Sequence, residues 1–262
     1  MEFSKKRSFK STIELVNSTV KPIISKLYDT IPEEINLKTV QKDESVTKTL
    51  GNILKQKTEI KSNPFLDSKK VVFLGLELSD FDVDSKILKM LHEASELIWY
   101  HIKDPYIDEF YNDVYNPYTN WRYPKTFHIT TLYIGNDISQ KKDEIYLNYK
   151  DRVSVIIDFV GIIIVPYKLV ACICFPDYNV KNKIPHMTTF IDQWEPKYSN
   201  DVLESIFING ELKKEFETVF RNPNYNKDFV KKLNTYVYEE KVTVYVAKFK
   251  KNYRFNSVAK YF

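Results

Sequence analysis

A nearly unbroken apolar run from Val155 to Phe175 places the tightest limit on how this chain can fold. Its length suggests a membrane helix, but it is rich in β-branched residues, which favour strands. Charged and turn-forming residues also interrupt it, namely Asp158, Gly161, Pro166 and Lys168. The run therefore predicts two buried strands, 153–165 and 169–175, joined by a turn, and no membrane span.

Hydrophobic periodicity predicts the remaining elements of the folded part. Helical spacing gives 85–100 one apolar face, made by Ile87, Met90, Leu91, Ala94, Leu97 and Ile98 and continued by His101. Three prolines argue against a regular element in the aromatic-rich connection 102–126. Further strands are expected at 71–78, 127–134, 186–191 and 242–249, and further helices at 199–207 and 211–220. Strands and helices thus alternate along the chain.

The chain divides by character into two parts. Residues 1–66 form a basic N-terminal extension, expected to be partly helical or flexible, and 67–262 form the folded domain. Lys and Arg are in excess in 1–70 and 241–262, whereas Asp and Glu are in excess between them, and the net charge is +4. Basic ends on an acidic body fit a polyanion such as RNA, but solvated termini explain them equally well.

Composition excludes several functional classes. With five glycines and no glycine-rich loop, the chain lacks nucleotide-triphosphate and dinucleotide fingerprints. Its two cysteines, Cys172 and Cys174, lie in apolar surroundings and are expected to be buried thiols of a reducing compartment. The N-terminus has no apolar segment typical of a secretory signal. We expect an intracellular monomer, in the cytoplasm or nucleus.

One pattern occurs twice in the sequence. His128-Ile129-Thr130-Thr131-Leu132 and His186-Met187-Thr188-Thr189-Phe190 both read His-apolar-Thr-Thr-apolar, and together they use two of the four histidines. On a strand, residues i and i+2 point to the same face, so each histidine lies beside the first threonine of its motif. Two such strands side by side would converge two imidazoles and two hydroxyls on one groove.

This constellation suits a phosphodiester substrate. Histidine can act as acid or base near neutral pH, so one imidazole can take a proton while the other gives one. His128 and His186 are therefore the expected catalytic pair, and the hydroxyls of Thr130 and Thr188 would bind phosphate oxygens. Two histidines without a nearby carboxylate or third histidine leave a zinc site incomplete, so no metal and no cofactor is expected.

At these residues the chain resembles the two-histidine (2H) phosphoesterase superfamily, over about 68–250. The resemblance implies an α/β (α+β), bilobal fold, with two pseudo-symmetric antiparallel sheets and outer helices around a central cleft. The segments 127–135 and 185–188 are most similar to the cyclic phosphodiesterase domain of tRNA ligases and related RNA-repair proteins. A Ser-Asn-x-x-Leu segment at Ser199 adds to this similarity, although Ser199 alone would be interpreted as a helix cap.

The resemblance implies a hydrolase that converts RNA 2′,3′-cyclic phosphate ends to 2′-phosphates without a metal. Alternatives are a phosphodiesterase that degrades 2′-5′ oligoadenylates or cyclic nucleotides, and a catalytically silent RNA-binding module. The expected partners are therefore RNA ends or small 2′-5′-linked or cyclic nucleotides. Candidate substrate-binding residues are Tyr133, Phe190, Trp121 and Tyr123 for base stacking, Lys125 and Arg122 for phosphate contacts, and Ser199.

Overall fold

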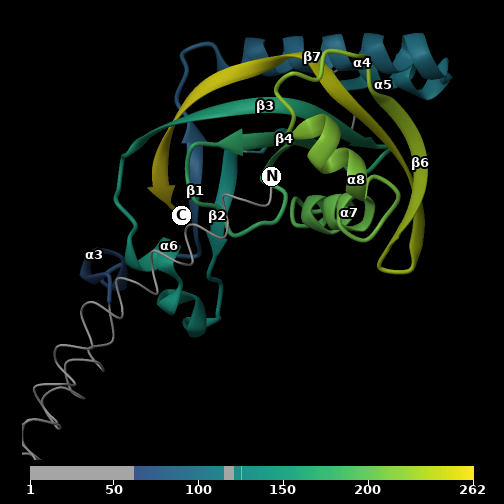
Figure 1. The fold of residues 1–262 in the computed structure, drawn as a ribbon. Helices are drawn as coiled ribbons and strands as arrows, with labels where there is room; N and C mark the ends of the chain where they lie inside the picture. Colours follow the sequence, from purple (N-terminus) through teal and green to yellow (C-terminus); the bar gives the residue numbers. More distant parts are fainter. Residues whose placement is uncertain (1–61, 115–120, 125) are drawn as a thin grey trace, which may run out of the picture. The chain divides into compact units, whose positions relative to one another are not determined.

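The computed structural model describes residues 62–114, 121–124 and 126–262 (Figure 1). Expectations for residues 1–61 lie outside the described residues. Within these ranges, seven strands form one antiparallel sheet in the order β2-β1-β7-β3-β4-β5, with β6 paired to β7. The strands are β1 (Phe73–Leu78), β2 (His128–Tyr133), β3 (Ser154–Val165), β4 (Leu169–Pro176), β5 (His186–Ile191), β6 (Val230–Val237) and β7 (Glu240–Tyr261).

Helices lie on both faces of the sheet. The helices α4 and α5 cover one face, and α7 and α8 lie on the other (Figure 1). The helical elements are α3 (Pro64–Asp67), α4 (Val83–Ile102), α5 (Pro105–Val114), η1 (Ile138–Lys142), α6 (Glu144–Leu147), α7 (Tyr198–Phe207), α8 (Lys213–Glu215) and η2 (Phe216–Phe220). No helix within the described ranges has the length and hydropathy needed to cross a bilayer. The α+β class is confirmed.

Each face of the sheet buries its own hydrophobic core. On β3, Ile162 and Ile164 pack into the core under α4, whereas Ile163 and Val165 pack into the core under α7. Because both faces of β3 and β4 are covered, their sequences are apolar at nearly every position. The prediction of two buried strands in the apolar run is confirmed, and so is the apolar face of α4.

The sheet differs from the expected pair of pseudo-symmetric sheets, because all seven strands belong to one sheet. The physical reason is the length of β3 and β7. These two strands pair with each other from Ser154 and Val258 to Ile164 and Tyr245, so they join the strands on either side into one sheet. The pairing of the two strands shifts register between Phe159 and Gly161. A Cβ atom at Gly161 would lie 2.5 Å from the Phe220 ring, so only glycine allows the strand this close to η2.

Several local expectations also need correction. Residues 105–114 form α5 despite the prolines of the connection, because Pro105 is its first residue, where a missing N–H costs no hydrogen bond. The strand β6 was not predicted, because polar residues dominate its exposed face. The predicted helix 211–220 is the short α8 followed by the π-helical turn η2. Leu66 in α3 is buried in the same core as α4.

Candidate active site

The two motif strands lie at opposite ends of the strand order, yet they contact each other. Arg122, upstream of β2, exchanges two backbone hydrogen bonds with Ile191 at the end of β5, with N···O distances of 2.8 and 3.0 Å. Ahead of β5, the backbone N–H of Lys181 donates to the carbonyl of Thr131 on β2 at 2.8 Å. The segment that flanks each motif is thus bonded to the strand of the other motif.

A cavity of about 540 Å³ lies where the two motifs meet. His128 and Thr130 line it from β2, and His186 and Thr188 line it from β5. The second threonine of each motif is buried away from the cavity, as the strand period predicts. The cavity is also lined by Phe73, Pro124, Tyr133, Asn182, Pro196, Lys197, Ser199, Asn200, Asp201 and Tyr238.

Both imidazole rings are oriented by the same kind of contact. The Nδ1 atom of His128 lies 3.0 Å from the carbonyl oxygen of Thr126, and that of His186 lies 2.8 Å from the carbonyl oxygen of Ile184. A carbonyl can only accept, so Nδ1 carries the hydrogen in both rings. The other nitrogen, Nε2, is therefore the atom that gains and loses a proton in each ring.

The surroundings of the two rings favour the neutral form. The His128 ring stacks on Phe73, with centroids 4.9 Å apart, and lies 5.2 Å from the ring of Phe262. Burial lowers the pKa of His128 below its usual value. Burial also lowers the pKa of His186, and a positive charge on His128 lowers it further. A positive charge on one ring therefore disfavours protonation of the other.

Ser199 connects the second motif to helix α7. Its Oγ atom lies 2.8 Å from Nε2 of His186 and 3.0 Å from Oγ1 of Thr188, and it donates to the carbonyl of Pro196 at 2.6 Å. The helix begins at Tyr198, so Ser199 lies inside its first turn and makes no cap. The interpretation of Ser199 as a helix cap is therefore wrong, and its hydroxyl belongs to the site.

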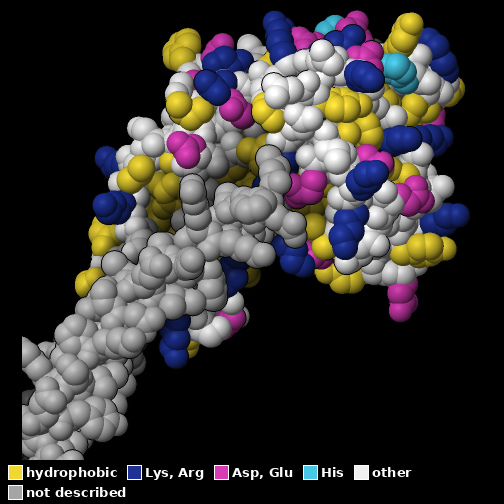
Figure 2. All heavy atoms as spheres, viewed as in Figure 1, with side chains coloured by type: hydrophobic (Ala, Val, Ile, Leu, Met, Phe, Trp, Pro, Cys, Tyr) yellow, Lys and Arg dark blue, Asp and Glu magenta, His cyan; other side chains and the backbone are white. Residues whose placement is uncertain are grey.

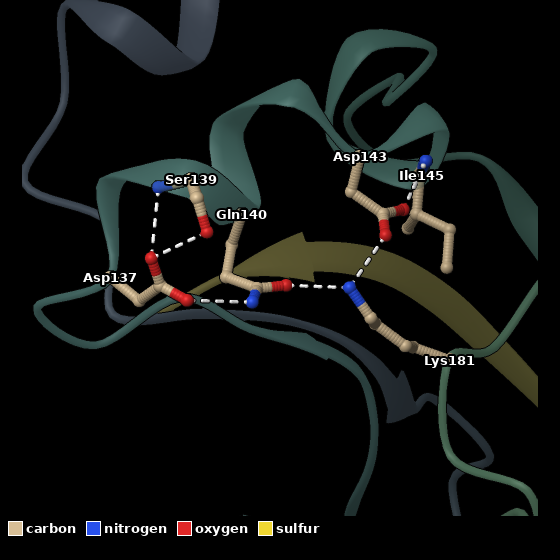
Figure 3. A network of polar contacts seen from close by, with 6 residues as sticks. All are labelled: Asp137, Ser139, Gln140, Asp143, Ile145 and Lys181. Carbon is tan, nitrogen blue, oxygen red and sulfur yellow. Dashed lines mark hydrogen bonds and ion pairs between the residues drawn. The ribbon is translucent and has the colours of Figure 1, made fainter.

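A polar network centred on Lys181 holds the segment that precedes β5 (Figure 3). The Lys181 ammonium donates to Gln140 at 2.6 Å and to Asp143 at 2.8 Å. Gln140 in turn donates to Asp137, which also accepts from Ser139. These partners follow β2 in the sequence, so the network ties the two motif-bearing parts of the chain together. Asn182, which lines the cavity, directly follows the anchored lysine.

The predicted base-stacking residues divide into one at the cavity and three away from it. Tyr133 lines the cavity and is 65% exposed. Phe190 is fully buried, which corrects its assignment, because a core side chain presents no surface to a base. Tyr123 packs on Phe190 with centroids 4.5 Å apart, and Trp121 packs against Phe110. Neither of these two rings lines the cavity.

The two residues predicted to contact phosphate, Arg122 and Lys125, are not among the described residues that line the cavity. The Arg122 guanidinium donates to the carbonyl oxygen of Asp192 at 2.9 Å, outside the cavity. Lys125 lies outside the described residues. Tyr238 and Asn182 were not predicted to belong to the site, although both line the cavity. Nothing in their local sequence distinguishes them, because only the folded sheet brings them to the two motifs.

Three of the six basic side chains in the segment 241–262 make ion pairs. Lys250, Arg254 and Lys260 make ion pairs with Asp228, Asp158 and Glu77, respectively. On the face drawn in Figure 2, Lys and Arg side chains are interspersed with Asp and Glu side chains.

The sulfur and metal chemistry of the described residues is simple. Cys172 and Cys174 are buried free thiols, as predicted, and burial raises the pKa of Cys172 to about 12. Across 62–114, 121–124 and 126–262, no group of three or more His, Cys, Asp or Glu side chains is arranged to hold a metal ion.

Comparisons with known proteins give little beyond this geometry. No protein-family model matches the chain, and no curated protein matches it. Matching solved structures include one described as "Crystal Structure of Fungal RNA Kinase", at 16% identity and a TM-score of 0.43. The match covers 92% of this chain and 58% of that chain. At this similarity the match carries no argument about function.

Proposed function

We propose that this protein is a phosphodiesterase of the two-histidine type, with His128 and His186 as its acid and base. The observation that supports this best is the convergence of both His-x-Thr motifs on one cavity from opposite edges of the sheet. A structural role for either motif alone would not require the two to face each other. The preferred substrate is an RNA end that carries a 2′,3′-cyclic phosphate.

The ring geometry supports acid–base roles. In each histidine the Nδ1 hydrogen is held by a backbone carbonyl, which leaves Nε2 to exchange protons. One neutral and one protonated imidazole provide a base and an acid at the same time. This pairing is what an in-line displacement at phosphorus needs, since one oxygen loses a proton as another gains one.

The proposed reaction is a hydrolysis. The neutral imidazole removes a proton from water, whose oxygen attacks phosphorus and forms a new P–O bond. The bond between phosphorus and the ribose O3′ breaks, and the protonated imidazole gives its proton to O3′. The product is a 2′-phosphate with a free 3′-hydroxyl, and one proton remains on the histidine pair. Negative charge that builds on the non-bridging oxygens accepts hydrogen bonds from Thr130 and Thr188.

The test is hydrolysis in EDTA of two substrates side by side, an RNA oligonucleotide with a 2′,3′-cyclic phosphate end and a 2′-5′ oligoadenylate. Conversion of the first to a 2′-phosphate end supports the proposal. Turnover of only the second moves the protein to degradation of small signalling nucleotides. A protein that cleaves neither, or that needs an added divalent metal, contradicts the proposal. The double variant His128→Ala/His186→Ala, purified in parallel, controls for contaminating nucleases.

A further inference from the structure

The turn between β6 and β7 holds Tyr238 in an unfavourable backbone conformation. Val237 pairs with Glu240, so Tyr238 and Glu239 are the two central residues of a tight hairpin. Their φ angles are +47° and +69°. Turns with two positive φ angles favour Asn and Gly, whose steric conflicts there are small, and a tyrosine is uncommon at such a position.

The strained turn brings the Tyr238 side chain to the candidate active site. Tyr238 lines the same cavity as His128 and His186. Its hydroxyl donates to Asp201 at 3.1 Å, and its ring makes an edge contact with Tyr198, with centroids 5.3 Å apart. Despite these two contacts, Tyr238 is 70% exposed. The contacts therefore fix the ring in place without covering it.

A fixed and exposed aromatic ring at this position offers a flat surface on which a planar group can stack. The cavity of about 540 Å³ is larger than a cyclic phosphate and its ribose require. Every nucleobase has a π-face that stacks on an aromatic side chain. Backbone strain of this kind is retained where the surrounding structure holds it, most often at functional sites.

We propose that Tyr238 is a specificity-determining residue that stacks on the nucleobase of the substrate. This inference rests on the proposed function, and it adds which part of the substrate is recognised. The phosphate and ribose lie against the histidines and threonines, while the base lies against the Tyr238 ring.

Three variants separate stacking from the effect of the turn. Tyr238→Asn removes the ring and installs a residue that tolerates a positive φ, so the hairpin keeps its shape. Glu239→Asn makes the same replacement at the neighbouring turn position, which does not line the cavity. Tyr238→Phe keeps the ring and removes the hydrogen bond to Asp201. Thermal unfolding of all three checks that each variant is folded.

The measurement is KM for two substrates, adenosine 2′,3′-cyclic phosphate and methyl ribofuranoside 2,3-cyclic phosphate, which has no base. For the nucleotide, Tyr238→Asn is expected to raise KM roughly 5- to 100-fold, the range for loss of one base–aromatic stack. KM for the base-free substrate should not change in Tyr238→Asn, and Glu239→Asn should leave both KM values near those of the wild type. Tyr238→Phe, which keeps the ring, should raise KM for the nucleotide less than Tyr238→Asn does. An unchanged KM for the nucleotide in Tyr238→Asn, or an equal rise for both substrates, overturns the inference.

A binding measurement distinguishes failure of this inference from failure of the proposed function. If the wild type hydrolyses neither of these two substrates, titration calorimetry with adenosine 2′-phosphate and ribose 2-phosphate takes the place of kinetics, and failure to hydrolyse the RNA oligonucleotide as well refutes the proposed function. Weaker binding of adenosine 2′-phosphate alone in Tyr238→Asn supports stacking. Equal binding of adenosine 2′-phosphate by wild type and variant, including no binding by either, overturns it.

Discussion

The Nε2 atom of His186 lies 2.8 Å from the hydroxyl oxygen of Ser199, which also donates to the carbonyl of Pro196 at 2.6 Å. A hydroxyl has one hydrogen and can accept others. When His186 is neutral, Ser199 can donate to its Nε2 atom. When His186 is protonated, the ring donates to Ser199, and the serine hydrogen turns to Pro196. Ser199 therefore provides a partner for both protonation states of this histidine.

Replacing Ser199 with alanine should impair catalysis more than substrate binding. The substitution removes one hydrogen bond that holds the imidazole, and we expect kcat to fall roughly tenfold with little change in KM. Steady-state kinetics across the pH range measure this effect. Ser205→Ala is the matched control, because Ser205 lies on the same helix and bonds to the carbonyl of Val202 instead. Wild-type kcat and an unchanged pH profile in Ser199→Ala would show that the contact is only structural.

The two histidines should behave as a unit. His128→Ala and His186→Ala are each expected to lower kcat roughly 10²–10⁴-fold, as for loss of a general acid or base. The fold-loss in kcat of the double variant should be smaller than the product of the two single losses, because the acid and the base act together and the loss of either one already removes most of their joint effect. His92→Gln, on the outer side of α4, serves as the control. Single-turnover rates with the cyclic phosphate substrate give the comparison, and multiplicative losses would contradict paired action.

The first threonine of each motif should matter for turnover, and the second should not. Thr130→Val and Thr188→Val remove hydroxyls that point into the cavity, and each is expected to lower kcat roughly 10²-fold. Thr131→Val makes the same change on the opposite face of β2, where the side chain is buried. It should retain wild-type turnover. Similar losses at Thr130 and Thr131 would show that valine damages the strand and not phosphate binding.

The buried histidines should make the fold less stable in mild acid. In the folded state, burial holds the pKa of His128 and of His186 below the ordinary value, whereas the unfolded chain has ordinary values. The unfolded state therefore binds more protons as the pH falls through about 6.5, and the free energy of unfolding decreases. Denaturant titrations above and below this pH measure the change. His186→Gln should lose part of the pH dependence, and an identical dependence in that variant would contradict the assignment.

The features that the sequence predicted best are those that depend only on neighbouring residues. Strand periodicity placed His128 beside Thr130 and His186 beside Thr188, because side-chain alternation depends only on neighbouring residues. The uninterrupted apolar run predicted the two central strands for the same reason. Ser199 shows the limit of such reasoning. Its helix position was predicted, but its partner His186 lies on another element, so the local pattern suggested a cap.

The order of the strands could not be predicted in the same way. β7 lies between β1 and β3, and it pairs residues as distant in sequence as Leu74 and Tyr261. Nothing local encodes such a pairing, and the expectation of two separate sheets came from a family resemblance. The position of Tyr238 was missed for a related reason. Its hairpin has Tyr-Glu in place of the Asn-Gly or Asp-Gly that identifies such turns from sequence.

The central place of β7 has a consequence for protein synthesis. β1, β2, β4 and β5 are all synthesised before β7, yet β7 is the strand that joins the β1–β2 pair to β3, β4 and β5. Domains fold only after the segments that complete their cores have emerged. A nascent chain that lacks β7 carries both His-x-Thr motifs, but no continuous sheet connects β2 to β5. The two motif strands would therefore take their final places in the sheet only after β7 has been synthesised.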